Sequence, residues 1–165
     1  MSQVAEIGSA TQTYTVYVNA KPEQVWDAIT KPEWTQRYGY GGTVAYDLRP
    51  GGAYGAYASE EMREHGAPEV VVEGEVLEAE PPRRLAQTWR MLFDEELASE
   101  PFTRLTWQID QDDEGFTRVS LTHEVDGAPR HAAIVSGSVP DAGGGWPFVL
   151  SDLKTLLETG KSLRG

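Results

Sequence analysis

Apolar and polar residues alternate near the start of the chain as they do in a half-buried β-strand. From Thr13 onward, Tyr14, Val16 and Val18 share one face, and the residues between them share the other. Similar patterns bounded by turn residues recur at 44–57, 70–77, 84–93, 102–111 and 117–125. Short strands joined by turns predict an antiparallel sheet in which neighbours along the chain pair with each other.

Helical spacing of apolar residues marks three other segments. Pro22 suits the first position of a helix, and the apolar residues after it predict a helix of about nine residues. Pro32 ends this helix and begins a second short one that runs to about residue 38. Residues 146–160 repeat apolar side chains at helical spacing and predict a long terminal helix that stops at Gly160.

The order of these elements predicts the fold class. One strand is followed by two short helices, six strands and one long helix. An amphipathic helix beside a one-sided antiparallel sheet must bury its apolar stripe on that sheet, which gives an α+β sandwich. The 165 residues suit one domain spanning 1–165, with an ordered core at about 12–161.

The segment Asp47–Tyr54 predicts a tight reversal inside a β-hairpin. Pro50 fixes φ near the value required at the first central position of a type II turn. Gly51 can supply the positive φ required at the second central position. Aromatic and apolar residues alternate on both sides, as expected for paired strands.

The charge balance argues against two classes of partner. Lys and Arg number 14 against 26 Asp and Glu, for a net charge of −12. Nucleic acids and anionic membrane surfaces require a basic patch, so neither is an expected partner. We interpret the acidic runs at 94–96 and 112–114 as solvated loops. Neither a signal peptide at Met1–Ala10 nor an apolar membrane-spanning segment is evident, so the expected location is cytoplasmic.

Metal and cofactor chemistry find little support in the sequence. Cysteine is absent, which excludes disulfides, thiolate nucleophiles and cysteine-bound zinc. His65, His123 and His131 are too scattered for a local metal motif. Gly39–Gly42 resembles part of a phosphate loop but lacks the lysine and hydroxyl residue that hold phosphate and magnesium. We therefore expect no metal and no cofactor.

His123 is the one polar residue on a strand face shared with Val119, Leu121 and Val125. It could be a buried structural histidine with hydrogen-bond partners, a polar group that orients a ligand, or a general acid or base. The sequence leaves these three interpretations open, with the structural one favoured.

Trp89, Met91, Phe93 and Trp107 form an aromatic and sulfur-containing set on two neighbouring predicted strands. Core packing is the default interpretation, but such side chains also line apolar pockets. The glycine-rich segment 126–144 shows no periodicity and is interpreted as a loop that could gate such a pocket.

Several motifs together resemble a known family. They are the segments 22–29 (P-E-Q-V-W-D-A-I), 32–34 (P-E-W), 47–54 (D-L-R-P-G-G-A-Y), 84–89 (R-L-A-Q-T-W), 117–123 (T-R-V-S-L-T-H) and the helix beginning at Gly145-Trp146. In this order they resemble a bacterial family named after activators of the ninety-kilodalton heat-shock protein ATPase, within the START-like, helix-grip superfamily. The resemblance implies a curved antiparallel sheet of about six to seven strands around a long C-terminal helix, enclosing a cavity. Lys21 departs from the pattern, because relatives often have a capping serine or aspartate there, and Asn19 is an alternative cap.

The resemblance implies a container for a hydrophobic or aromatic small molecule, in a monomer or homodimer. The candidate cavity-lining residues are Trp34, Tyr38, Tyr40, Tyr54, Trp89, Met91, Phe93, Trp107, His123 and Trp146. A second hypothesis is a cyclase or dehydratase acting on a polyketide-like substrate, with His123 paired with Tyr54 or Tyr40. A third is a stress-response co-chaperone of the heat-shock ATPase, although eukaryotic activators carry a second domain for which this chain has no room.

Overall fold

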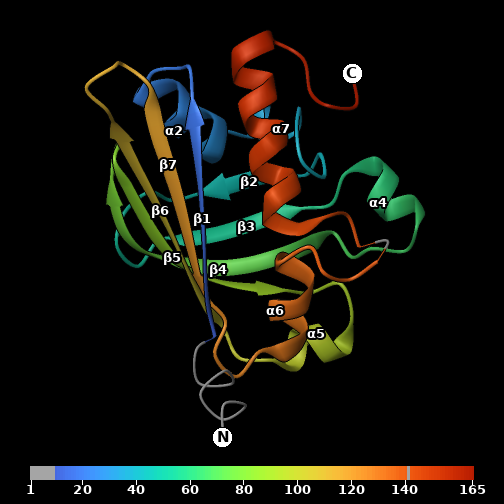
Figure 1. Ribbon diagram of the computed structural model, residues 1–165. Coiled ribbons are helices and arrows are strands. Elements are labelled where there is room, and N and C mark those ends of the chain that lie inside the picture. The colour runs from blue at the N-terminus through green and yellow to red at the C-terminus, as the bar shows by residue number, and fades with distance from the viewer. Residues whose placement is uncertain (1–9, 141) are drawn as a thin grey trace, which may run out of the picture.

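The computed structural model describes residues 10–140 and 142–165, and one antiparallel sheet dominates it. The sheet has seven strands in the order β1-β7-β6-β5-β4-β3-β2 (Figure 1). The strands are β1 (Thr11–Val18), β2 (Thr43–Tyr46), β3 (Ala53–Tyr57), β4 (Val70–Glu80), β5 (Arg84–Met91), β6 (Thr103–Gln111) and β7 (Thr117–Glu124). The predicted strands are all present, so the α+β class and the antiparallel meander are confirmed. Residues 1–9, which the sequence places before the ordered core, lie outside the described part of the chain.

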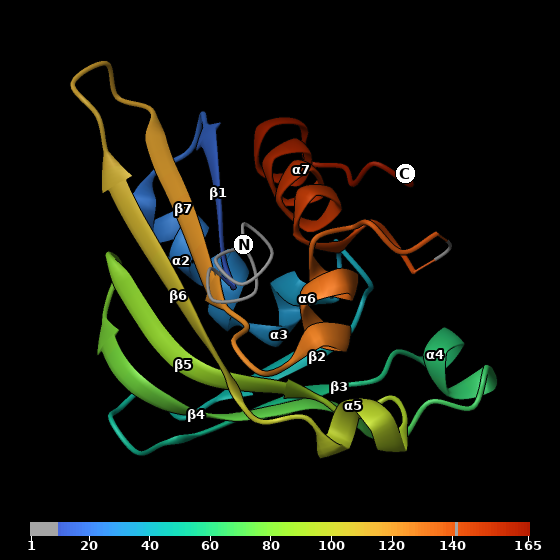
Figure 2. The same ribbon diagram turned by 60° about the horizontal axis from the view of Figure 1, so that its bottom comes forward.

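Six helices accompany the sheet within the described residues. They are α2 (Pro22–Thr30), α3 (Pro32–Thr35), α4 (Glu60–Glu64), α5 (Glu95–Ser99), α6 (Pro129–Val135) and α7 (Gly145–Thr159). Figure 2 shows that the sheet is strongly curved and that α7 lies on its concave side. None of these helices has the length and apolar character required to cross a bilayer.

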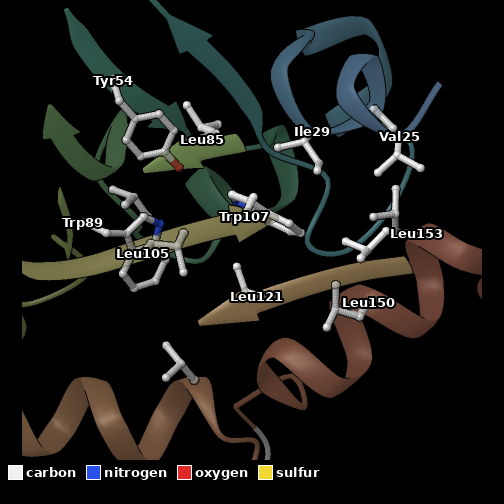
Figure 3. Close-up of a cluster of buried hydrophobic side chains, with 14 of the residues drawn as sticks. Val25, Ile29, Tyr54, Leu85, Trp89, Leu105, Trp107, Leu121, Leu150 and Leu153 are labelled. Atoms are coloured by element: carbon white, nitrogen blue, oxygen red, sulfur yellow. The ribbon is translucent and has the colours of Figure 1, made fainter. Parts of the chain in front are cut away.

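The core lies between the concave face of the sheet and α7 (Figure 3). Alternate residues of β6 and β7 are buried, including Leu105, Trp107 and Leu121. The facing stripe of α7 buries Leu150 and Leu153, as helical spacing requires. The helix therefore closes the sheet on the side where the cavity is expected.

The predicted turn is confirmed at Arg49–Gly52. The Gly52 N–H donates to the Arg49 carbonyl at 2.8 Å, so Pro50 and Gly51 are the central residues. Gly51 has φ of +87°, the left-handed value that a type II turn requires at its second central position. This turn aligns β2 with β3, where Tyr46 pairs with Tyr54.

The start of α2 differs from the alternative considered for its cap. Lys21 is the cap residue, and its N–H donates to the Gln24 side-chain oxygen at 2.8 Å. Asn19 does not cap the helix, because within the described residues its side chain accepts no hydrogen bond from the first turn; its backbone N–H donates to Glu158 on α7 at 2.7 Å. The glutamine at the third helical position thus supplies half of a capping box.

Three short helices, α4, α5 and α6, lie in segments for which the sequence predicted a loop or no secondary structure. The acidic run at 94–96 is the cap and first turn of α5, with the Asp94 carboxylate accepting from the Leu97 N–H at 2.8 Å. The segment 126–144 contains α6 instead of an irregular loop. A helix of seven residues is too short to display a clear period, so the pattern could not separate it from a loop.

Candidate functional site

The concave face of the sheet and the helices opposite it enclose a cavity of about 190 Å³. Strands β2 to β6 supply one wall, and the segment 38–42 together with the start of α7 supplies the other. Aromatic and aliphatic side chains dominate the lining. No charged side chain lines it among the residues that the structure describes.

Eight of the ten candidate residues line this cavity. They are Tyr38, Tyr40, Tyr54, Trp89, Met91, Phe93, Trp107 and Trp146. Phe93 is 42% exposed and borders the solvent-facing side of the cavity. The sequence placed it in a strand, but β5 ends at Met91. Trp89 and Trp107 extend from neighbouring strands into the space, and Trp146 joins them from α7.

Trp34 and His123 do not line the cavity. Trp34 packs at the edge of the core with the Arg37 guanidinium 4.8 Å from its ring centroid. His123 lies behind Trp89 and Trp146, with ring centroids 5.0 Å and 6.0 Å away. Strand alternation correctly places His123 on the inner face, but it cannot show which inner residues meet open space.

Every hydrogen-bonding atom of the His123 ring has a protein partner. Trp146 Nε1 donates to His123 Nδ1 at 3.0 Å, and His123 Nε2 lies 2.7 Å from Thr103 Oγ1. The Thr103 hydroxyl in turn donates to the Trp89 carbonyl at 2.6 Å, so it accepts from His123. Burial, and secondarily the nearby His131, lowers the pKa of His123 from 6.5 to about 3. The ring is therefore neutral and holds the aromatic wall in place.

Some lining residues were not among the candidates. They include Ile29, Thr35, Val44, Tyr46, Met62, Val71, Val72 and Val149. Alternation along β2 could have identified Tyr46, because it pairs directly with Tyr54. Met62 lies on α4, a helix of five residues that the apolar pattern did not indicate.

Three of the lining tyrosines, Tyr38, Tyr46 and Tyr54, lie near one another. Tyr38 donates to the Ala28 carbonyl at 2.8 Å, and Tyr46 donates to Gln87 Oε1 at 2.5 Å. The Tyr46 and Tyr54 rings are 4.6 Å apart. Burial, with a smaller contribution from neighbouring tyrosines for Tyr38 and Tyr46, raises the pKa of all three well above its usual value. These phenols stay protonated and can act as hydrogen-bond donors at neutral pH.

The segment over the cavity is fastened to α7 and the C-terminal residues. Asp152 Oδ2 accepts from the Gly39 N–H at 2.8 Å, and Asp152 Oδ1 accepts from the Leu163 N–H at 2.6 Å. Arg164 donates to the Gly39 carbonyl at 3.1 Å. The Tyr40 hydroxyl accepts from the Gly145 N–H at 3.0 Å. These bonds give the cavity wall a defined shape without a long element of secondary structure.

A second hollow of about 510 Å³ adjoins the cavity and shares four of its lining residues, Tyr40, Met62, Met91 and Phe93. It lies among α4, α5 and α6, which gather at one end of the sheet in Figure 2. Charged side chains surround it, and two of them, Asp94 and Arg130, form an ion pair at 2.8 Å. The hollow thus has charged side chains around it and meets the apolar cavity at the four shared residues.

His131 attaches α6 to Glu100 and to the end of β5 next to this hollow. Its Nδ1 donates to Glu100 Oε1 at 2.7 Å, and its Nε2 accepts from the Met91 N–H at 2.8 Å. Burial would raise the pKa of Glu100, but hydrogen bonds from His131 and the Arg130 backbone outweigh it and lower that pKa. Within the described chain, no group of three or more His, Cys, Asp or Glu side chains could hold a metal ion.

Comparisons with known proteins agree with this architecture. The family model described as Activator of Hsp90 ATPase homolog 1-like protein matches residues 19–158. A search of the curated proteins found no match.

Solved structures share the fold at low sequence identity. CalU16 from Micromonospora echinospora is 21% identical with a TM-score of 0.64, over 93% of this chain and 78% of that one. DynU16, a protein of the dynemicin biosynthetic locus, is 21% identical with a TM-score of 0.67, over 93% of this chain and 49% of that one. Protein NE0264 from Nitrosomonas europaea is 17% identical with a TM-score of 0.65, over 93% and 97%. The helix-grip architecture expected from the motifs is confirmed.

Proposed function

Because the chain belongs to the family of Activator of Hsp90 ATPase homolog 1-like proteins, we propose that its cavity binds an uncharged hydrophobic or aromatic small molecule. The observation that carries this proposal is an apolar cavity of about 190 Å³ that no described charged side chain lines. Burying a charge without a partner is costly, so such a lining disfavours ionic ligands. The ligand is held between the sheet and α7.

The size of the cavity suggests the size of the ligand. An engineered apolar cavity of about 150 Å³ in another protein binds benzene. A volume of about 190 Å³ therefore suits one ring or two fused rings. Flat rings can pack on Trp89 and Trp107, whose aromatic faces and edges give stacking contacts beyond simple burial.

The catalytic alternative receives less support from the geometry. It requires a titratable pair inside the cavity, but His123 does not line the cavity and both its ring nitrogens are occupied. The candidate partners Tyr40 and Tyr54 have pKa values raised by burial, which disfavours a phenolate base. The co-chaperone alternative rests on the family's name alone.

Titration with 1-naphthylamine tests the proposal, because this dye has two fused rings, is uncharged at neutral pH and changes its emission in apolar surroundings. We expect saturable binding at micromolar concentration or tighter, with quenching of tryptophan emission. Ala56→Phe adds a ring inside the cavity and should weaken binding about tenfold or more. Ala45→Phe adds the same ring at an exposed position of β2 and is the matched control. A flat titration with folded wild-type protein would refute the container proposal.

A further inference from the structure

Three polar atoms converge on one region of the cavity. Figure 3 shows the Tyr54 hydroxyl oxygen and the indole nitrogens of Trp89 and Trp107 pointing toward the space between their rings. The three residues come from β3, β5 and β6, and all three line the cavity. Each atom carries a hydrogen that can be donated. Three other lining hydroxyls, those of Thr35, Tyr38 and Tyr46, already donate to protein acceptors.

The hydrogen bonds of these donors are incomplete. The Trp89 indole N–H lies close enough to the Tyr54 hydroxyl to oppose the rise that burial causes in the pKa of Tyr54. Neither the Tyr54 hydroxyl proton nor the Trp107 N–H has an acceptor among residues 10–140 and 142–165. The neighbouring donors differ, since Tyr38 and Trp146 give their hydrogens to Ala28 and His123.

The two free donors border open space inside the protein. Across the described residues, Arg90 Nε is the only fully enclosed side-chain nitrogen or oxygen without a hydrogen-bond partner. Tyr54 is 8% exposed and Trp107 is 4% exposed, so the little surface they retain belongs to the cavity. Polar groups in such a position are satisfied only by whatever occupies the cavity.

The geometry points to a specific ligand class: an uncharged aromatic compound whose carbonyl oxygen accepts hydrogen bonds from Tyr54 and Trp107. This inference rests on the proposed binding function and adds a polar requirement to it. A carbonyl oxygen has two lone pairs and can accept both hydrogens at once. A hydrocarbon of the same shape leaves both donors unsatisfied, and an anion lacks a charged partner in the lining. The donor cluster thus selects ketones over hydrocarbons.

The two bicyclic probes 1-tetralone and tetralin test this selection, because they differ only in the carbonyl group. Calorimetric titration should show 1-tetralone binding about tenfold tighter or more, since each net hydrogen bond contributes about fivefold. Infrared spectra of carbonyl-labelled 1-tetralone should show the stretching band at lower frequency in the complex than in an aprotic solvent. The infrared measurement reports donation directly in the wild-type protein and does not depend on the folding of a variant.

Two variants locate the donors. Tyr54→Phe and Trp107→Phe should each reduce the preference for 1-tetralone to about threefold or less and move the carbonyl band back toward higher frequency. Tyr38→Phe is the matched control, because its hydroxyl already donates to Ala28 at 2.8 Å. This control should change both affinities by the same factor and leave their ratio unchanged.

The outcomes separate this inference from the proposed function. Tight binding of both probes with equal affinity, or a preference that survives both Tyr54→Phe and Trp107→Phe, would overturn the carbonyl inference and leave the container intact. An unshifted carbonyl band in the wild-type complex would also overturn it. Failure of both probes and of the dye to bind folded protein would refute the container, and the carbonyl inference with it.

Discussion

The two buried histidines illustrate how neighbours set the chemistry of a residue. His123 accepts a hydrogen at Nδ1 from Trp146 and donates at Nε2 to Thr103. His131 has the opposite arrangement, donating at Nδ1 to Glu100 and accepting at Nε2 from the Met91 N–H. Each ring joins segments that are distant in sequence. Sequence alone identified His123 as unusual but could not identify its partners.

His123 predicts a specific dependence of stability on pH. Its pKa is about 3 in the folded protein and near 6.5 when unfolded, so protonation favours the unfolded state. The stabilising contribution of the neutral ring is complete above pH 6.5 and is lost as the pH falls toward 3. The slope of unfolding free energy against pH between 5 and 6.5 should decrease in His123→Gln, measured by urea denaturation. An unchanged slope would contradict the depressed pKa.

The same variant tests the structural interpretation of His123. Glutamine can donate and accept hydrogen bonds, so His123→Gln should cost about 1–2 kcal/mol, whereas His123→Leu leaves the Trp146 N–H unpaired and should cost about 2–4 kcal/mol. Dye affinity should change little in His123→Gln. A large loss of binding in a fully folded glutamine variant would instead indicate a direct contact with ligand.

Substitutions at Gly51 should change stability through backbone strain and not through packing. Its φ of +87° disfavours β-branched residues, while a Cβ placed there meets nothing within 4 Å. Gly51→Val should therefore destabilise the protein by about 1–3 kcal/mol. Gly51→Asn should cost less, because asparagine tolerates left-handed backbone better. Thermal denaturation of both variants checks this, and equal stabilities would show that steric strain at φ does not limit the turn.

At the scale of elements, α6 depends on one side chain outside it. The Glu100 carboxylate accepts from the Arg130 N–H at 2.9 Å, the His131 N–H at 3.0 Å and His131 Nδ1 at 2.7 Å. These bonds satisfy the first turn of a helix that has no side-chain cap of its own. The short helix is thereby held against the end of β5.

Glu100→Gln should loosen α6 selectively. One carboxylate oxygen becomes an NH₂ group that cannot accept a hydrogen bond, at a cost of about 1–3 kcal/mol. Hydrogen exchange of the amides at 129–135 should accelerate more than exchange in β6 and β7. Glu96→Gln changes an exposed carboxylate 3.9 Å from Arg130 and is the control. Equal exchange rates in the two variants would contradict this role for Glu100.

At the scale of the whole molecule, Asp152 connects three parts of the chain. From α7 it accepts hydrogen bonds from Gly39 over the cavity and from Leu163 near the C-terminus, and it is 1% exposed. The cavity wall therefore depends on contacts made by the last residues of the chain. A loss at this position should affect ligand retention as well as stability.

Asp152→Asn keeps the shape of the side chain but removes one acceptor. We expect a loss of about 1–3 kcal/mol of stability and faster dissociation of the dye, because the Gly39 segment is held less firmly. Ser151→Ala alters an exposed neighbour on α7 and serves as the control. Stopped-flow dissociation rates check the prediction, and identical rates in both variants would show that this segment does not restrain the ligand.

The long and periodic parts of the molecule could be predicted from sequence. Alternation in the strands and the apolar stripe of α7 specify which faces must be buried, so they determined the α+β class and the inner placement of Trp89 and Trp107. The turn at Arg49–Gly52 could be predicted from Pro50 and Gly51 alone, because the φ values that it requires are properties of these two residues. The six family motifs, which occur in the expected order along the chain, predicted the helix-grip fold.

Tertiary structure decided the features that depend on contacts between distant segments. The curvature of the sheet determined that Tyr54 and Trp107 meet open space while His123 is sealed behind Trp89. The short helix α6 exists through bonds to Glu100 and Met91, which lie 31 and 40 residues from His131. Local patterns report which face of an element is apolar. Whether an inner side chain fills the core or borders a cavity depends on the volume left by all the others, and only the folded chain defines that volume.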